Sequence, residues 1–344
     1  MGKKAIGFPI FLVFSLNIIG AAETKLSMEL WNRYTLERKD DKTEKNAFSV
    51  ERGYFRLDPT FTDNIKGRFT LDFFSSDKYS DGAGLKLKYA YVEFNNVIPI
   101  PESRLSCGID KNYFGTVYDW EYVTIEKALE DKEKVAASAD YGVFFTGFIP
   151  QGFGEYAISL INGEGYSKAG SKVNINPSPV INLRLIPLPG ITIGGSLLYE
   201  KAGFIDTIKT EYDKRMLYAG VARFAFGPLD AWFEYLSQQL GVTTRGEYKE
   251  TMSQGLMIMP VLRLVKPLDF VLRYDQWDPN TSKEKDAYST LIGGFNWNIL
   301  HDSQGLPTLF IQTNWQRKMY EDSEKSAVDL IMVQLRWKFG NTLQ

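Results

Sequence analysis

The chain carries few residues suited to catalysis. Its 344 residues include one histidine, His301, and one cysteine, Cys107. A histidine base needs a partner that reaches the same substrate atom. Asp302 and Ser303 follow His301 directly in a predicted turn, so the three side chains do not converge on one atom. A single cysteine permits neither an internal disulfide nor a thiolate metal site. We therefore expect no enzyme, no metal and no cofactor.

Charged residues recur instead at every second position of short segments. Between residues 65 and 74, Lys66, Arg68 and Asp72 alternate with apolar side chains. Successive side chains of a strand point to opposite faces, so each segment has one charged and one apolar face. An Arg or Lys facing lipid at mid-bilayer costs about 2–4 kcal/mol, so in a membrane barrel the charged face lines the lumen. The residues expected there are Lys66, Arg68, Asp72, Arg104, Asp110, Arg184, Arg223, Glu234, Arg263, Arg273, Asp275, Arg336 and Lys338.

Two roles are open for these lumen residues. They either form ion pairs between strands that stiffen the wall, as Arg68 and Asp72 could, or they set the ion selectivity of a pore. Basic residues outnumber acidic ones by nine to four in this set, which favours a modest preference for anions.

About sixteen such segments follow one another along the chain. The connections between them alternate: short ones contain Pro or Gly, and long ones are polar. Short turns on one side and long loops on the other are typical of an outer-membrane barrel, whereas a soluble sandwich has no reason to alternate its loops so strictly. The strands are expected to begin near Leu26, Ala47, Ile65, Leu85, Arg104, Tyr141, Phe153, Val180, Ile191, Arg215, Leu229, Thr251, Leu268, Tyr288, Thr308 and Ala327. The expected long loops are 75–84, 111–140, 162–179, 201–214, 239–250, 278–287 and 319–326.

The composition agrees with this architecture. Aromatic residues make up 14% of the chain, and they are favoured both in strands and in the girdles of membrane barrels. The formal net charge is −2, so there is no general basic field that would attract a nucleic acid. The fold class expected is an all-β, transmembrane, antiparallel β-barrel.

The N-terminus resembles an export signal. Lys3 and Lys4 precede a largely apolar run at 5–19, and Gly20, Ala21 and Ala22 supply small residues for cleavage before Glu23. This order is typical of a secretory signal peptide, and the run is short for a membrane-spanning helix of about 20 residues. We expect a signal peptide at 1–22 and a barrel at 23–344.

One segment departs from the strand pattern. Residues 125–137 are rich in helix formers with helical spacing, which predicts a short helix in the third external loop. This helix either lies on the surface or belongs to a loop folded into the pore that narrows it. In the second case the constriction-loop residues would be Tyr118, Trp120, Glu126, Lys127 and Lys132.

Several motifs, in this order, resemble the phosphate-selective porin O and P family: ERGYFR at 51–56, GRF at 67–69 with Asp72, YAYVE at 89–93, NGEG at 162–165 and RYDQWDPN at 273–280. The resemblance implies a sixteen-stranded homotrimeric porin whose third loop enters the pore. Phosphate-selective members place a lysine cluster at the constriction. Here the loop has Lys127, Lys132 and Lys134, but also Glu121, Glu126, Glu130, Asp131 and Glu133. Phosphate selectivity is therefore not expected.

The favoured interpretation is a porin in the bacterial outer membrane. Its partners would be outer-membrane lipid and small anions or hydrophilic solutes that diffuse passively through it. One alternative is a selective channel with an internal binding site, in which Tyr113, Tyr118, Trp120 and Tyr122 stack on sugars or aromatic solutes. The other alternative is a structural or adhesive barrel that does not conduct.

Overall fold

The computed structural model describes residues 23–76, 78, 80, 82–96, 98–168, 176–201, 212–244, 246–265 and 267–343. The signal peptide predicted for residues 1–22 lies outside these residues. Within the described part of the chain, no helix has the length and apolar character needed to cross a membrane.

Strands make up most of the described chain. The sixteen strands are β1 (Glu23–Lys39), β2 (Lys42–Thr60), β3 (Ile65–Ser75), β4 (Ala83–Asn95), β5 (Arg104–Lys111), β6 (Ala139–Ile149), β7 (Gly154–Ile161), β8 (Ser178–Leu188), β9 (Ile191–Lys201), β10 (Lys214–Phe226), β11 (Leu229–Thr244), β12 (Glu247–Val265), β13 (Leu268–Asp278), β14 (Tyr288–His301), β15 (Pro307–Tyr320) and β16 (Val328–Leu343). Two short helices accompany them, α1 (Leu129–Lys132) between β5 and β6, and the 3-10 turn η1 (Pro150–Gly152) between β6 and β7.

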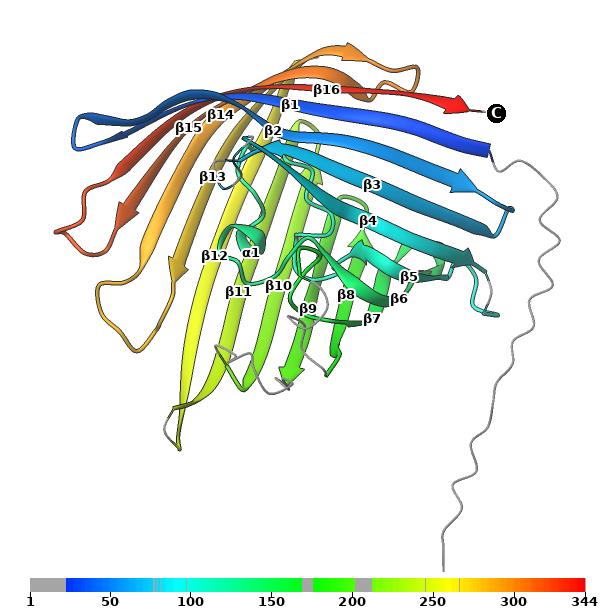
Figure 1. The fold of residues 1–344 in the computed structure, drawn as a ribbon, viewed down its shortest axis with the longest axis horizontal. Coiled ribbons are helices and arrows are strands. Elements are labelled where there is room, and N and C mark those ends of the chain that lie inside the picture. The colour runs from blue at the N-terminus through cyan, green and yellow to red at the C-terminus, as the bar shows by residue number, and fades with distance from the viewer. Residues whose placement is uncertain are drawn as a thin grey trace, which may run out of the picture.

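The strands form one closed antiparallel barrel. Each strand pairs with its neighbours in sequence, and β1 also pairs with β16, from Thr24 opposite Leu343 to Lys39 opposite Val328 (Figure 1). Closure leaves no open sheet edge, which a sheet inside lipid requires because lipid offers no hydrogen-bonding partner. We call the end of the barrel with the short connections the turn end, and the opposite end the loop end.

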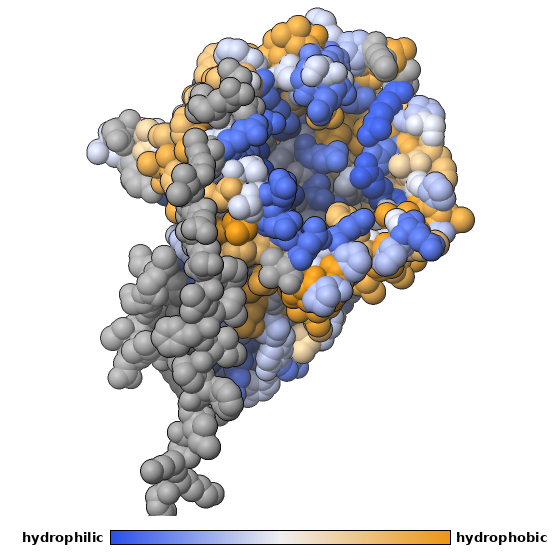
Figure 2. Space-filling view, turned by 90° about the vertical axis from the view of Figure 1, so that its right-hand side faces the viewer, coloured by the Kyte–Doolittle hydropathy of each residue, from blue (hydrophilic) through white to orange (hydrophobic). Residues whose placement is uncertain are grey.

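The two faces of the barrel wall differ in polarity. On β16, Ile331, Val333 and Leu335 point outward and are exposed in the isolated chain, while Gln334 and Arg336 point inward and are buried. Figure 2 looks at the turn end and shows hydrophilic residues around a hollow, with hydrophobic residues on the outside. The alternation that predicted a lipid-facing and a lumen-facing side is present in the structure.

The expected barrel, its sixteen strands and the short helix in the third loop are confirmed. Two expectations about extent were wrong. The helix covers only four residues, 129–132, of the expected 125–137. The expected loop at 239–250 is mostly strand, because β11 and β12 continue as a hairpin to Thr244 and Glu247. Val242, Thr243 and Tyr248 favour strand structure, so the hairpin extends beyond the point where alternation suggested a loop.

Candidate functional site

The third loop, residues 112–138 between β5 and β6, folds into the barrel and crosses its lumen (Figure 1). Its middle part reaches the inner face of β14 and β15, where side-chain amides bind its backbone. The bonds run from Asn296 Nδ2 to Val123 O (2.9 Å), from Gln312 Nε2 to Tyr122 O (2.8 Å) and from Ile125 N to Asn314 Oδ1 (2.6 Å). The short α1 has a different cause: Ala128 has an extended backbone (ψ 152°) and Lys134 a left-handed one (φ 58°), so the helix begins after the first residue and ends before the second.

A buried ionic cluster on β13 holds the next part of the loop. Arg273 has no exposed surface and donates two hydrogen bonds to Asp275, at 2.7 and 2.9 Å. Its Nη1 also donates to Lys127 O at 2.7 Å. From the loop, Lys132 Nζ lies 2.9 Å from Asp275 Oδ2. Arg273 and Asp275, both expected on the lumen face, therefore lie beneath the loop and fasten it to the wall.

Arg215 fastens the end of the third loop near the loop end of the barrel. It forms an ion pair with Glu200 at 2.6 Å, and both side chains are buried. The same guanidinium donates to Val135 O in the third loop at 2.9 Å and to Gly163 O in the following loop at 3.1 Å. One side chain thus ties two loops to β9 and β10.

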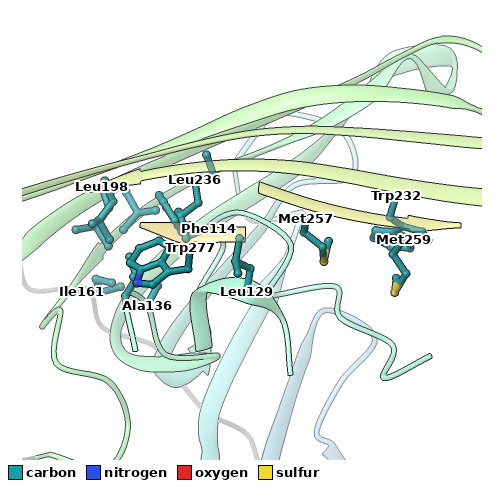
Figure 3. Packing of buried hydrophobic residues seen from close by; sticks show 14 of the residues in the cluster. Phe114, Leu129, Ala136, Ile161, Leu198, Trp232, Leu236, Met257, Met259 and Trp277 are labelled. Carbon is teal, nitrogen blue, oxygen red and sulfur yellow. The ribbon is translucent and has the colours of Figure 1, made fainter. Parts of the chain in front are cut away.

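Apolar packing closes the space between the loop and the wall of β9–β13. Phe114 and Leu129 of the loop are fully buried, and they pack with Leu236, Met257 and Trp277 of the wall (Figure 3). A buried apolar side chain of this size contributes about 1.5–3 kcal/mol. The loop is therefore held as part of the packed interior.

The loop leaves a cavity of about 390 Å³ between itself and β2, β4 and β5. The wall supplies Arg52, Lys88 and Lys111 to this constriction cavity, and the loop supplies Asp119, Glu121 and Asp131. Charges of opposite sign thus line opposite sides of one narrow space. A solute that passes through it must cross a strong local field, because fixed charges act strongly where little water screens them.

The pKa of the Asp119 carboxyl group lies above its ordinary value. Burial raises the pKa of its carboxyl to about 6; Arg184 opposes this rise and the neighbouring Glu155 adds to it. The loop side of the constriction cavity therefore loses negative charge in mildly acidic solution.

Arg52 is surrounded by aromatic rings. Its guanidinium lies 5.1 Å from the ring centre of Trp31, 5.5 Å from that of Tyr54 and 5.3 Å from that of Tyr122, and it donates to the Tyr122 hydroxyl at 2.9 Å. Contacts of this kind contribute about 0.5–2 kcal/mol each. Tyr122 belongs to the third loop, so Arg52 both lines the cavity and binds the loop.

A second and wider cavity of about 770 Å³ opens toward the turn end (Figure 2). Arg56, Arg68 and Lys338 line it, and Tyr54 borders both this cavity and the constriction cavity. The two spaces therefore follow one another along the lumen. We call the wider one the vestibule.

The other residues expected on the lumen face lie mainly in ion pairs. Arg68 pairs with Asp58 at 2.6 Å, so the suggested pair with Asp72 was wrong; Asp72 lies 3.6 Å from Arg52 instead. Arg68 also lies at the vestibule, away from the third loop. The other ion pairs are those of Arg104 with Glu93 (2.7 Å) and Asp110 (2.6 Å), of Arg223 (2.6 Å) and Arg263 (3.1 Å) with Asp230, and of Arg336 (2.9 Å) and Lys338 (3.9 Å) with Glu29. Lys66 lies opposite Glu93 in the pairing of β3 with β4. Arg184 donates a hydrogen bond to Gly115 O in the third loop.

The expected constriction-loop residues divide into two groups. Tyr118 and Trp120 line the constriction cavity. Glu126, Lys127 and Lys132 do not: the Glu126 carboxylate accepts from Lys127 N at 2.9 Å, Lys127 pairs with Asp131 at 3.2 Å, and Lys132 lies against β13.

Sequence reasoning missed the three basic wall residues of the cavity. Two of them lie at irregularities in strand register: Arg52 directly follows the extra residue of β2, and Lys88 is itself the extra residue of β4. The pairing of β1 with β2 shifts between Trp31 and Asn32, opposite Arg52 and Val50, and the pairing of β3 with β4 shifts at Lys88. A β-bulge adds one residue and reverses the faces that follow it. In the sequence, the segments that form β2 and β4 alternate only weakly between polar and apolar residues, and this was the signal that could have revealed the bulges.

Known proteins were compared with the chain by sequence and by structure. No protein-family model and no curated protein sequence matches it. Solved structures do match: OmpF of Salmonella typhi in complex with daunomycin (11% identity, TM-score 0.64, covering 92% of this chain and 97% of that one) and the outer-membrane channel DcaP of Acinetobacter baumannii (11%, 0.65, 92% and 97%). The anion-selective porin of Comamonas acidovorans matches with 10% identity and a TM-score of 0.62, covering 93% of this chain and all of that one. At this identity the similarity shows the fold alone: this chain has the barrel fold of these outer-membrane proteins.

Proposed function

We propose that the chain is a passive channel of the bacterial outer membrane for small hydrophilic solutes and ions. One observation carries this proposal. The third loop crosses a closed barrel, yet it leaves a charged cavity of about 390 Å³ that adjoins the wider vestibule. A barrel with only a structural task could fill its lumen completely, and it would not need charges of both signs facing each other across the remaining space.

The location in the outer membrane follows from the wall. Its outer face presents large apolar side chains, such as Leu183, Phe270 and Trp337, and its closure satisfies the backbone without water. Export by a signal peptide at 1–22 agrees with this location. The resemblance to the phosphate-selective porin O and P family and the homotrimer that it implies belong to the same proposal.

A modest preference for anions is part of the proposal. Lys88 and Lys111 lie at the constriction cavity, and Arg56 and Lys338 lie at the vestibule. The carboxylates of the loop oppose these charges, so selectivity for phosphate is not proposed.

The alternative of an internal site that stacks on sugars or aromatic solutes receives less support. Cations already lie over three of the rings that would form it: Arg184 over Tyr118 (5.2 Å), Arg273 over Trp120 (4.9 Å) and Arg52 over Tyr122 (5.3 Å). Tyr113 packs against Tyr118 with ring centres 5.3 Å apart.

Single-channel recordings in planar bilayers test the proposed function. Wild-type protein is expected to conduct, and its reversal potential in a salt gradient should indicate a mild anion preference. Lys111→Glu reverses one charge at the constriction cavity and should move this potential toward cation selectivity. Lys283→Glu makes the same change in an exposed loop, where salt screens the charge, and should move it far less. Absence of conductance, or equal shifts in both variants, would contradict the proposal.

A further inference from the structure

Two carboxyl groups meet where the third loop touches β11. Glu130 belongs to α1 in the loop and Glu234 to the inner face of β11, and their exposed fractions are 0% and 1%. Both accept a hydrogen bond from the same amide: Thr116 N lies 2.6 Å from Glu130 Oε1 and 3.0 Å from Glu234 Oε1. The Thr116 hydroxyl lies 2.9 Å from Glu234 Oε2. The two carboxyl groups are also within hydrogen-bonding reach of each other.

The described residues provide no counter-ion at this meeting point. Among the described residues, neither glutamate has a basic side chain within 4.0 Å. The charged groups packed nearby are already engaged: Arg184 of β8 donates to Gly115 O, and Arg273 of β13 is paired with Asp275. Asp119, also in the loop, adds a further acidic group. The contacts from β9 and β12 are uncharged, since Ser196 accepts from Gly115 N at 3.0 Å and Met257 is apolar.

Two carboxylates cannot both remain ionised in such a place. Each buried charge without a partner costs several kcal/mol, and two like charges at this separation repel strongly. Protonation of one group removes the repulsion and provides a donor, so that the protonated carboxyl can bind the ionised one.

We propose that Glu130 and Glu234 form a buried proton-binding site, and that the bound proton is part of the link between the third loop and the barrel wall. The proton lies between the two carboxyl groups, and Thr116 N–H completes the donor set. Loss of the proton leaves two adjacent negative charges, one on each glutamate. The segment that includes Thr116 and Val117 then separates from β11 toward the constriction cavity, of which Val117 forms part.

The direction of the pH dependence follows from this arrangement. Burial raises the pKa of Glu130 above its ordinary value, and the hydrogen bond with Glu234 and those from the loop backbone lower it only in part. A folded state that holds a proton more tightly than the unfolded chain is stabilised at low pH, and this stabilisation is lost as the pH rises through the pKa of the site. The link should therefore remain intact at a pH at which exposed carboxyl groups are already ionised, and it should fail as the pH is raised further.

Glu234→Gln tests the site. A glutamine has the shape of a protonated glutamic acid: its Oε1 can accept from Thr116 N and its amide can donate to Glu130. We expect wild-type protein to keep an infrared band of a protonated carboxyl group at a pH at which exposed carboxyl groups are already ionised. This band should disappear as the pH is raised further, through the pKa of the site. In Glu234→Gln that titrating band should be absent. The infrared measurement does not depend on conductance. A negative result would therefore count against the proton-binding site and not against the proposed channel function.

Conductance supplies the second measurement. Wild-type channels should show a reversible fall in conductance as the pH is raised through the pKa of the site, called here the alkaline fall. Glu234→Gln should conduct as the wild type does below that pKa and should lack this fall. Glu93→Gln is the matched control, because Glu93 is also on the inner wall but is paired with Arg104 at 2.7 Å; it should keep both the band and the fall. An unchanged titrating band in Glu234→Gln would overturn the site, and an alkaline fall that persists in this variant would overturn its link to the loop.

Discussion

At the scale of single residues, the lumen is organised by cations that contact aromatic rings and carboxylates at the same time. Arg52 is the clearest case, because it contacts Trp31, Tyr54 and Tyr122 and also lines the constriction cavity. Such a side chain has little freedom, so its charge stays at one place in the lumen. Among the loop carboxyl groups of the same cavity, Asp119 has a pKa that burial raises.

Asp119 should make ion selectivity depend on pH. Its pKa is about 6 because burial disfavours the charged form. It is therefore ionised at about pH 7.5 and largely neutral at about pH 5, so acidification removes negative charge from the constriction cavity. The reversal potential of the wild type should move toward anion selectivity between these values. Asp119→Asn should have the more anion-selective potential already at the higher pH and should show a smaller step; an undiminished step would assign the titration to another group.

At the scale of elements, the pattern of the sequence predicted all sixteen strands but not the path of the third loop. Alternation is a local property, and β13 displays it from Phe270 to Trp277. The path of the loop depends on contacts with residues distant in sequence, such as Ile125 with Asn314 and Thr116 with Glu234. Bulges hid Arg52 and Lys88 for a related reason, since one added residue shifts every following side chain to the opposite face. The charged lumen was therefore predictable as a face, whereas the constriction cavity was not.

The ionic cluster on β13 should be essential for the position of the loop. Arg273→Ala removes a fully buried guanidinium and leaves Asp275 with Lys132 as its remaining cation. Breaking a buried pair in this way costs about 3–5 kcal/mol. We expect a large fall in the urea midpoint of unfolding and noisier single-channel currents.

The exposed pair of Arg317 and Asp329, 3.4 Å apart, provides the control for this change. Arg317→Ala should cost at most about 1 kcal/mol, since water and salt screen such a pair. Similar losses in the two variants would mean that the cluster on β13 does not hold the loop.

At the scale of the whole molecule, closure and lipid-facing polarity belong together. The wall has no unpaired strand along its circumference, and its outer apolar face would be unfavourable in water. Closure follows from the requirement that a membrane-embedded sheet satisfies its own backbone, and the apolar outer face follows from the contact of its side chains with lipid.

A closed barrel should resist denaturation by detergent at room temperature. Unheated protein in SDS should migrate differently from boiled protein, because no open edge is present at which the sheet could begin to separate. Gel electrophoresis of outer-membrane fractions measures this directly. Identical migration before and after boiling, together with extraction by aqueous buffer alone, would argue for a soluble protein.

The seam between β1 and β16 has a consequence for the time course of folding. It joins residues more than three hundred positions apart, such as Trp31 and Arg336. Contacts so distant in sequence form slowly, because the chain must lose much of its conformational freedom before they form. Until then the growing sheet presents two free margins, each able to pair with another chain. The risk of aggregation therefore persists through the whole of assembly, and it ends only when the final strand docks against the first.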